Sequence, residues 1–234
     1  MRENTFLRRS LWALAWLLGC TGLRNPLPAP AAGGVAFLAL GDSYTIGEGV
    51  PAAERWPVQL AHLARQQRVP LAEPTIVART GWTTQELQAA VQAVPRHPAP
   101  YGLVSLLIGV NNQYRGLPLP SYRAEFQQLL RAAVQLAGHR PGRVLVLSIP
   151  DWGQTPAAPA AERARIAAEI DQFNAAARAE CQQAGVAFVD ITPQTRAATD
   201  ARQFAPDGLH YSGQHMQGWA EAALPVVQRL LQAK

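Results

Sequence analysis

This sequence of 234 residues has few cysteines, almost no lysine and no long apolar run. Its cysteines are Cys20 and Cys181, and every basic side chain except Lys234 is an arginine. The apolar run Leu11–Leu18 is too short to cross a bilayer, because a spanning helix needs about 20 apolar residues. The absence of a Gly-x-Ser-x-Gly motif argues against the α/β-hydrolase fold. No group of histidines and acids has metal-ligand spacing, so we expect neither a metal nor another cofactor.

The charge of the chain argues against a nucleic-acid partner. The formal net charge is +5 at pH 7, and residues 1–19 contribute +2 of it. The other arginines are scattered, whereas a nucleic-acid surface needs a concentrated stripe of basic side chains to replace counterions. A chain of this length fits one domain with a sizeable core, and we expect a monomer.

The N-terminal segment is typical of an export signal. Arg8 and Arg9 precede the apolar run, which ends in Leu17-Leu18-Gly19-Cys20. This ending resembles the lipobox of bacterial lipoproteins, in which cleavage leaves a cysteine that carries lipid. We therefore predict a signal peptide over residues 1–19 and a lipid on Cys20. The protein would be exported and anchored to a bacterial membrane, in the periplasm or at the cell surface. The alternative is an ordinary cleaved signal with an incidental cysteine.

A tether and one domain follow the signal. Residues 20–34 are rich in proline and then glycine, which is typical of a linker. The domain then occupies residues 35–234. If Cys20 carries lipid, no disulfide can form within the chain, so we expect Cys181 to be a small buried apolar residue.

The domain begins with an apolar strand over residues 35–40 that stops at Gly41-Asp42-Ser43. A strand that is apolar on both faces is typical of the buried middle of a parallel sheet. Ligands of such sheets bind beyond the carboxyl ends of the strands, where Ser43 would lie. The alternative is that Asp42 and Ser43 only cap the helix that follows.

Further apolar segments alternate with helical patterns. Strands are predicted over 73–80, 103–108, 143–149 and 186–191, and helices over about 53–68, 85–94, 160–183 and 212–232, with another ending near 137. Parallel neighbours need crossover connections, which are helical and right-handed. The sequence therefore predicts an α/β fold: one three-layer α/β/α sandwich around a five-stranded parallel sheet.

The loop before the last helix carries a histidine and an acid. Asp207 precedes His210 by three residues, close enough for its carboxylate to orient the imidazole ring. An oriented imidazole is the base that activates a serine, and converging strand ends would bring it towards Ser43. His215 is the alternative base. Alternatively, Asp207-Gly208 is only a turn that leaves His210 at the surface.

Three groups could donate hydrogen bonds to a substrate oxyanion. They are the backbone N–H groups of Ser43 and Gly81 and the side-chain amide of Asn111, each at the carboxyl end of a different strand. Glycine at position 81 lets the backbone approach a ligand closely. The alternatives are that Gly81 only makes a turn and that Asn111 only caps a helix.

Four blocks of the sequence resemble the SGNH, or GDSL, hydrolase superfamily, in its order and at similar spacing. They are Gly41-Asp42-Ser43, Thr80-Gly81-Trp82-Thr83, Gly109-Val110-Asn111-Asn112 and Asp207-Gly208-Leu209-His210. The resemblance implies that Ser43 is the nucleophile, that His210 and Asp207 complete the catalytic set, and that Ser43, Gly81 and Asn111 form an oxyanion hole. It also implies a flavodoxin-like fold. Asn112 departs from the family, in which many members have aspartate.

The same resemblance implies a serine esterase with a small ester or lipid substrate. Lysophospholipase-like members and the predicted lipid anchor suggest lysophospholipids or short acyl esters. The alternatives are a carbohydrate O-acetyl esterase with the same site, and a non-catalytic module of this fold that binds carbohydrate or lipid. The candidates to contact the substrate are Trp82, Tyr114 and Tyr211, which lie beside the blocks, as do Arg115 and Trp152. For Trp152, core packing or loop anchoring is an equal alternative.

Overall fold

The computed structural model describes residues 34–94 and 99–232. The predicted signal peptide, the lipidation site at Cys20 and the tether up to residue 33 lie outside these residues. Within the described part of the chain, no helix combines the length and the apolar character that a membrane crossing requires.

The described residues form one five-stranded, all-parallel sheet, which confirms the predicted fold class. Its strand order is β2-β1-β3-β4-β5. Strand β1 (Val35–Gly41) pairs with β2 (Leu71–Ala78) and β3 (Leu103–Leu107), and β4 (Val144–Leu147) and β5 (Ala187–Val189) follow beyond β3. In flavodoxin-like sheets of this order, the ligand crevice lies where the order reverses, between the carboxyl ends of β1 and β3.

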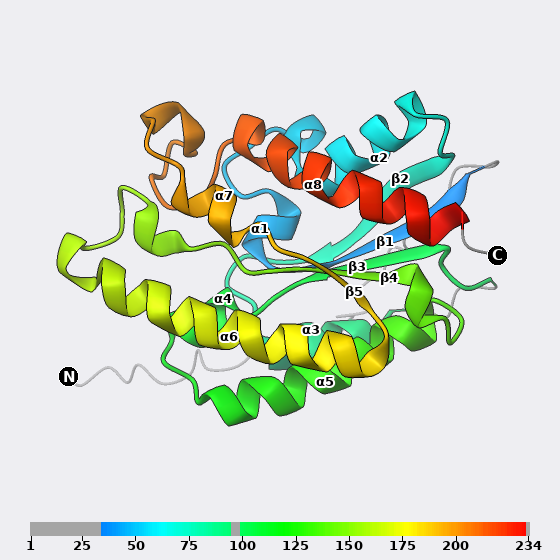
Figure 1. Cartoon of the computed structure of the whole chain (residues 1–234), viewed down its shortest axis with the longest axis horizontal. Coiled ribbons are helices and arrows are strands. Elements are labelled where there is room, and N and C mark those ends of the chain that lie inside the picture. Colours follow the sequence, from blue (N-terminus) through cyan, green and yellow to red (C-terminus); the bar gives the residue numbers. More distant parts are fainter. Residues whose placement is uncertain (1–33, 95–98, 233–234) are drawn as a thin grey trace, which may run out of the picture.

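Helices cover both faces of the sheet (Figure 1). On one face lie α2 (Trp56–Gln66) and α8 (Gly213–Gln232), and on the other lie α3 (Thr84–Gln92), α5 (Leu119–Leu136) and α6 (Arg163–Ala184). Every residue of β3 and β4 is buried, because apolar side chains on both faces of these strands have helices to pack against.

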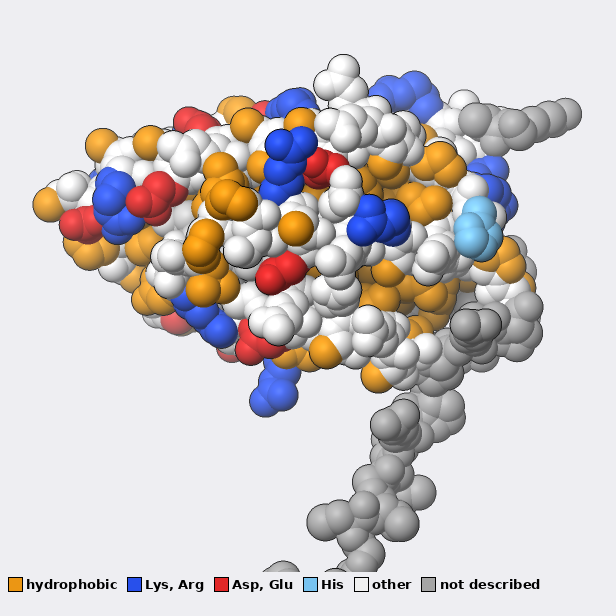
Figure 2. Space-filling model, turned by 90° about the horizontal axis from the view of Figure 1, so that it is seen from below, with side chains coloured by type: hydrophobic (Ala, Val, Ile, Leu, Met, Phe, Trp, Pro, Cys, Tyr) orange, Lys and Arg blue, Asp and Glu red, His pale blue; other side chains and the backbone are white. Residues whose placement is uncertain are grey.

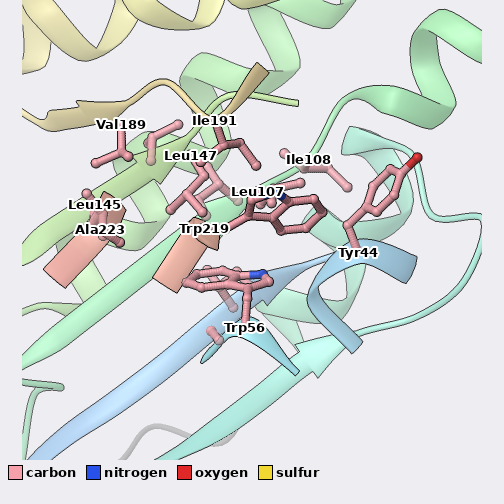
Figure 3. Packing of buried hydrophobic residues seen from close by; sticks show 14 of the residues in the cluster. Tyr44, Trp56, Leu107, Ile108, Leu145, Leu147, Val189, Ile191, Trp219 and Ala223 are labelled. Carbon is pink, nitrogen blue, oxygen red and sulfur yellow. The ribbon is translucent and has the colours of Figure 1, made fainter. Parts of the chain in front are cut away.

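The upper layer of the core is built around two tryptophans. Trp56 of α2 and Trp219 of α8 are fully buried, and Figure 3 shows the ring of Trp219 beside Leu107 and Leu147 of the sheet. On α8 the buried residues recur at helical spacing, which makes one side of this helix apolar. Cys181 of α6 is buried and free, as the sequence predicts.

Short helices follow three of the strands at one rim of the sheet. They are α1 (Ser43–Ile46) after β1, α4 (Val110–Tyr114) after β3 and α7 (Thr192–Arg196) after β5. Figure 1 shows them at the same end of the molecule. The 3₁₀ turn Trp152–Gln154, which follows β4, contacts α6 and α7. The rim therefore gathers segments that are far apart in the sequence.

One hollow lies away from the rim, on the face of the molecule that α5 and α6 cover. Figure 2 shows this face, below the sheet, where hydrophobic side chains gather towards one end. The hollow, of about 460 Å³, lies between α5 and α6, with Leu130, Val134, Arg131 and Glu180 among its walls. None of the predicted site residues lines this hollow.

Candidate active site

Ser43 is the first residue of α1, and only Asp42 separates it from the end of β1. Asp42 caps this helix, because its carboxylate accepts a hydrogen bond from the Tyr44 N–H at 3.0 Å. The turn from β1 into α1 requires glycine at position 41, where a Cβ atom would collide with the side chain of Thr45. The capping role that the sequence left open therefore belongs to Asp42, and the side chain of Ser43 lines a cavity.

This cavity has a volume of about 150 Å³. Its walls come from the start of α1, the start of α4, the turn after β4 and the loop before α8. The lining residues are Ser43, Tyr44, Val110, Asn111, Tyr114, Trp152, Leu209 and His210. The structure thus brings three candidate catalytic or oxyanion residues, Ser43, Asn111 and His210, to one small space, together with Tyr114 and Trp152.

His210 is held by Asp207 and is largely buried. Its Nδ1 lies 2.6 Å from Asp207 Oδ2, and its backbone N–H donates to Asp207 Oδ1 at 2.9 Å. The Leu209 N–H donates to the same Oδ1 at 2.9 Å. Partial burial acts to raise the pKa of Asp207, but these hydrogen bonds outweigh it and hold the pKa below its ordinary value of 3.8. The carboxylate is therefore ionised at neutral pH, which favours a proton on Nδ1 and leaves Nε2 as the basic nitrogen.

Tyr44 lines the cavity beside His210, and no pattern in the sequence singled it out. Its ring meets the imidazole ring edge to face, with centroids 5.5 Å apart. Figure 3 shows the Tyr44 hydroxyl pointing away from Trp219 and Trp56. Burial foremost, and then the nearby Tyr211 and carboxylates, raise the pKa of Tyr44 well above its ordinary value. The hydroxyl therefore stays protonated at neutral pH.

The candidate oxyanion donors lie on neighbouring segments. The Ser43 N–H is the first of α1, so no partner within the helix can accept from it. The Asn111 amide donates one hydrogen bond to the Trp82 carbonyl at 2.9 Å, which leaves its second N–H available. Gly81 has a φ of 83°, which favours glycine, and its carbonyl accepts from Arg115 at 2.5 Å. Gly81 does not line the cavity, but the next residue, Trp82, accepts a hydrogen bond from Asn111 with its carbonyl.

Asn112, the departure from the family pattern, joins α4 to the beginning of α3. Its Oδ1 accepts from the Thr84 N–H at 3.0 Å, and its Nδ2 donates to Thr84 Oγ1 at 2.6 Å. The Thr84 hydroxyl donates in turn to Glu125 on α5. An amide can accept and donate at once, whereas a carboxylate only accepts, so asparagine suits this arrangement.

The aromatic residues predicted to contact substrate have different positions. Tyr114 lines the cavity and is 61% exposed. Trp82 is half-buried and does not line it. Tyr211 is fully buried, does not reach the cavity, and donates from its hydroxyl to the Asp151 carbonyl at 2.8 Å. Trp152 does line the cavity.

His215, the alternative base, lies inside the aromatic core. It is buried, stacks on Tyr211 with ring centroids 4.6 Å apart, and does not line the cavity. Burial lowers its pKa to about 4. The imidazole beside Ser43 is therefore that of His210.

Asp42, the residue before Ser43, is fully buried. Its Oδ2 has no hydrogen-bond partner among the described residues. Burial, only partly offset by the backbone hydrogen bonds, raises the pKa of Asp42 to about 7. This group loses its proton only near neutral pH.

The polar side chains around the cavity are hydroxyls, an imidazole and a primary amide. Within residues 34–94 and 99–232, no three or more His, Cys, Asp or Glu side chains are grouped so that they could hold a metal ion.

Comparison with known proteins finds one family model and several solved structures of similar fold. The model of the GDSL-like Lipase/Acylhydrolase family matches residues 39–217. No curated protein matches the sequence. Among solved structures, TesA superimposes with a TM-score of 0.66 at 18% identity, over 84% of this chain and 99% of that one. A lipolytic G-D-S-L protein from Veillonella parvula gives a TM-score of 0.64 at 18% identity, over 83% and 98%.

A third similar structure is Axe2, an acetylxylan esterase from Geobacillus stearothermophilus. It gives a TM-score of 0.63 at 16% identity, over 86% of this chain and 95% of that one. At such low identities the likeness concerns the fold, and the α/β/α sandwich is common to all three.

Proposed function

Because the chain belongs to the GDSL-like lipase/acylhydrolase family, we propose that it is a serine esterase that hydrolyses carboxylic esters through Ser43. The observation that carries this proposal is the pairing of Asp207 with His210 at 2.6 Å, beside a cavity that Ser43 also lines. A serine hydroxyl is a weak nucleophile at neutral pH unless a positioned base removes its proton.

In the proposed reaction His210 acts first as base and then as acid. Its Nε2 takes the proton from Ser43 Oγ as the oxygen attacks the ester carbonyl carbon. It then returns the proton to the leaving alcohol, which leaves an acyl group on Ser43. Asp207 holds the other ring nitrogen, which fixes the ring and stabilises the imidazolium that forms. A water molecule, activated by His210 in the same way, releases the acid and restores the enzyme.

The negative charge on the carbonyl oxygen needs fixed donors in the transition state. We assign this role to the N–H of Ser43 and to the second N–H of the Asn111 amide, since both residues line the cavity. The N–H of Gly81 is a third candidate by the family resemblance alone, because Gly81 does not line the cavity. The hydrogen bond from Asn111 to the Trp82 carbonyl supports this assignment, because it holds the amide in place before the substrate binds. Donors that need no reorganisation contribute most to such catalysis. This chemistry uses no cofactor.

The test is hydrolysis of a p-nitrophenyl short-chain ester by wild type and by Ser43→Ala. We expect the variant to lose about a thousandfold or more in kcat. Ser121→Ala, which changes an exposed serine on α5, is the matched control and should keep the wild-type rate. Equal rates for wild type and Ser43→Ala would refute the esterase proposal.

A fluorophosphonate probe separates the esterase from a binding module. Such probes bond covalently to an activated serine, so wild type should be labelled and Ser43→Ala should not. A folded wild-type protein that stays unlabelled would favour the non-catalytic carbohydrate- or lipid-binding alternative.

We also propose that the protein is exported and held at a bacterial membrane by a lipid on Cys20. The sequence Leu17-Leu18-Gly19-Cys20 after a short apolar run supports this. Cys20→Ser should move the protein from the membrane fraction to the soluble fraction, whereas Cys181→Ala should not. An unchanged distribution of Cys20→Ser would refute lipidation.

A further inference from the structure

The cavity beside Ser43 is small compared with the substrates considered above. Its volume is about 150 Å³, and a protein cavity of about that size holds a molecule such as benzene, with six carbon atoms. A reacting ester must place its carbonyl group and the start of its acyl chain in this space. The long acyl chain of a typical lysophospholipid exceeds it.

One wall of the cavity is the indole ring of Trp152, which is fixed by hydrogen bonds. Its Nε1 donates to Gln113 Oε1 at 2.7 Å. The Gln113 amide donates in turn to Glu169 Oε2 at 2.7 Å, and Glu169 Oε1 accepts from Arg165 at 2.7 Å. Both Trp152 and Gln113 are buried, so the first of these bonds is shielded from competing water.

The backbone that carries Trp152 is also fixed. Asp151 is fully buried, and its carboxylate accepts from Arg196 at 2.8 Å and from the Gly153 N–H at 2.9 Å. The Asp151 carbonyl accepts from the Tyr211 hydroxyl at 2.8 Å. Rotating the indole out of the cavity would break its buried hydrogen bond to Gln113, and shifting the backbone that carries it would break the bonds of Asp151, so we treat the wall as rigid.

Tyr114 completes this side of the cavity at its mouth. Its ring meets that of Trp152 edge to face with centroids 5.0 Å apart, but 61% of Tyr114 is exposed. A chain too long for the cavity would have to leave past this residue into water. There it would gain little from burial.

From these contacts we propose that Trp152, held in place by Gln113, limits the acyl group that Ser43 accepts to a short chain of up to about six carbons. The proposal rests on the esterase function and narrows its substrates to esters of short acids, acetyl esters included. Trp152 acts by touching the acyl chain, and Gln113 is a positioning residue that acts through Trp152.

The experiment is a series of p-nitrophenyl esters from acetyl to dodecanoyl, with kcat/KM measured for each. Wild type should lose about tenfold or more between butyryl and decanoyl. Trp152→Ala should raise kcat/KM for decanoyl relative to acetyl by about tenfold or more, because it removes the wall. Trp152→Phe should give a smaller rise.

Two further variants separate the roles. Gln113→Leu cannot accept the indole N–H, so it should shift the chain-length profile in the same direction as Trp152→Ala, with a smaller change for acetyl than for decanoyl. Leu117→Ala changes an exposed side chain just beyond α4 and should leave the profile unchanged. An unshifted profile in both Trp152→Ala and Gln113→Leu would overturn the proposal.

Failure of this inference can be told from failure of the esterase proposal. If hydrolysis depends on Ser43 but wild type cleaves dodecanoyl esters as fast as acetyl esters, the esterase stands and the chain-length limit falls. If circular dichroism shows that Trp152→Ala does not fold, the proposal is tested on wild type alone, by comparing its rates of labelling by alkyl fluorophosphonates of different chain length. Faster labelling by a methyl than by a dodecyl probe supports the limit, and equal rates overturn it.

Discussion

Replacing Asp42 by asparagine should stabilise the protein near neutral pH and remove a pH dependence of its stability. Burial raises the pKa of this carboxyl group in the folded protein to about 7, from an ordinary value of 3.8. Between these two values the folded protein keeps a proton that the unfolded chain has lost. The free energy of unfolding therefore falls as the pH rises from about 4 to about 7.

The size of this effect follows from the difference between the two pKa values. About three pH units correspond to roughly 4 kcal/mol, which is a large part of the total stability of a typical domain. Asparagine stays neutral at every pH, and its Oδ1 can still cap α1 by accepting a hydrogen bond from the Tyr44 N–H. Its amide nitrogen replaces Oδ2, which has no partner among the described residues. We therefore expect the free energy of unfolding of the variant to equal that of wild type near pH 4 and to exceed it by more and more as the pH rises.

The assay is urea unfolding of wild type and Asp42→Asn at several values between pH 4 and pH 8, followed by tryptophan fluorescence. The difference in the free energy of unfolding should grow to roughly 4 kcal/mol at neutral pH and stay constant above it. Glu221→Gln, the same chemical change at an exposed position on α8, is the control and should show no such trend. A difference that does not vary with pH would refute the reasoning.

Three more changes test other parts of the rim. Asp207→Asn keeps an oxygen that accepts from the backbone, but it presents an N–H to His210 Nδ1 and so favours the tautomer with its proton on Nε2. The kcat on a short ester should therefore fall by about a thousandfold or more. A loss below tenfold would contradict the role of Asp207 in orienting His210. Asn111→Ala removes an oxyanion donor and should lower kcat by about a hundredfold or more with a smaller effect on KM, and an effect on KM alone would contradict it. Arg196→Met leaves the buried carboxylate of Asp151 without its cation, and urea unfolding should show a loss of about 3 kcal/mol. An unchanged unfolding midpoint would show that this ion pair contributes nothing.

The sheet could be predicted from the sequence because its strands are apolar on both faces. The runs over 103–108 and 143–149 contain β3 and β4, and no soluble loop would hold so many apolar residues in succession. Their ends were less predictable. The run over 186–191 keeps its apolar pattern, but only Ala187–Val189 pairs with β4, since Asp190 and Ile191 already lead into α7. Periodicity reports burial, whereas a strand ends where hydrogen-bonded pairing stops.

The roles of neighbouring residues in the site were harder to predict. His210 and Tyr211 are adjacent in the sequence, and both were candidates to meet the substrate. Tyr211 forms a β-bridge with Phe204, so the chain is extended there and successive side chains point to opposite sides. His210 therefore lines the cavity while Tyr211 enters the core beside His215.

Tyr44 and Trp152 show a different limit of sequence reading. Their place in the wall depends on how α1 and the turn after β4 face each other, which no spacing in the sequence reports. One signal was available for Tyr44. The family takes its name from Gly-Asp-Ser-Leu, and this chain has tyrosine where that name has leucine.

The sheet also decides which way the cavity faces. β1 extends from Val35 to Gly41, about 23 Å for its seven residues, so Ser43 and the beginning of this strand lie at opposite ends of the sheet (Figure 1). A protein held at a surface by residues that precede Val35 would therefore be attached at the end of the sheet remote from its reactive serine. An ester dissolved in water would then reach the cavity without passing the point of attachment.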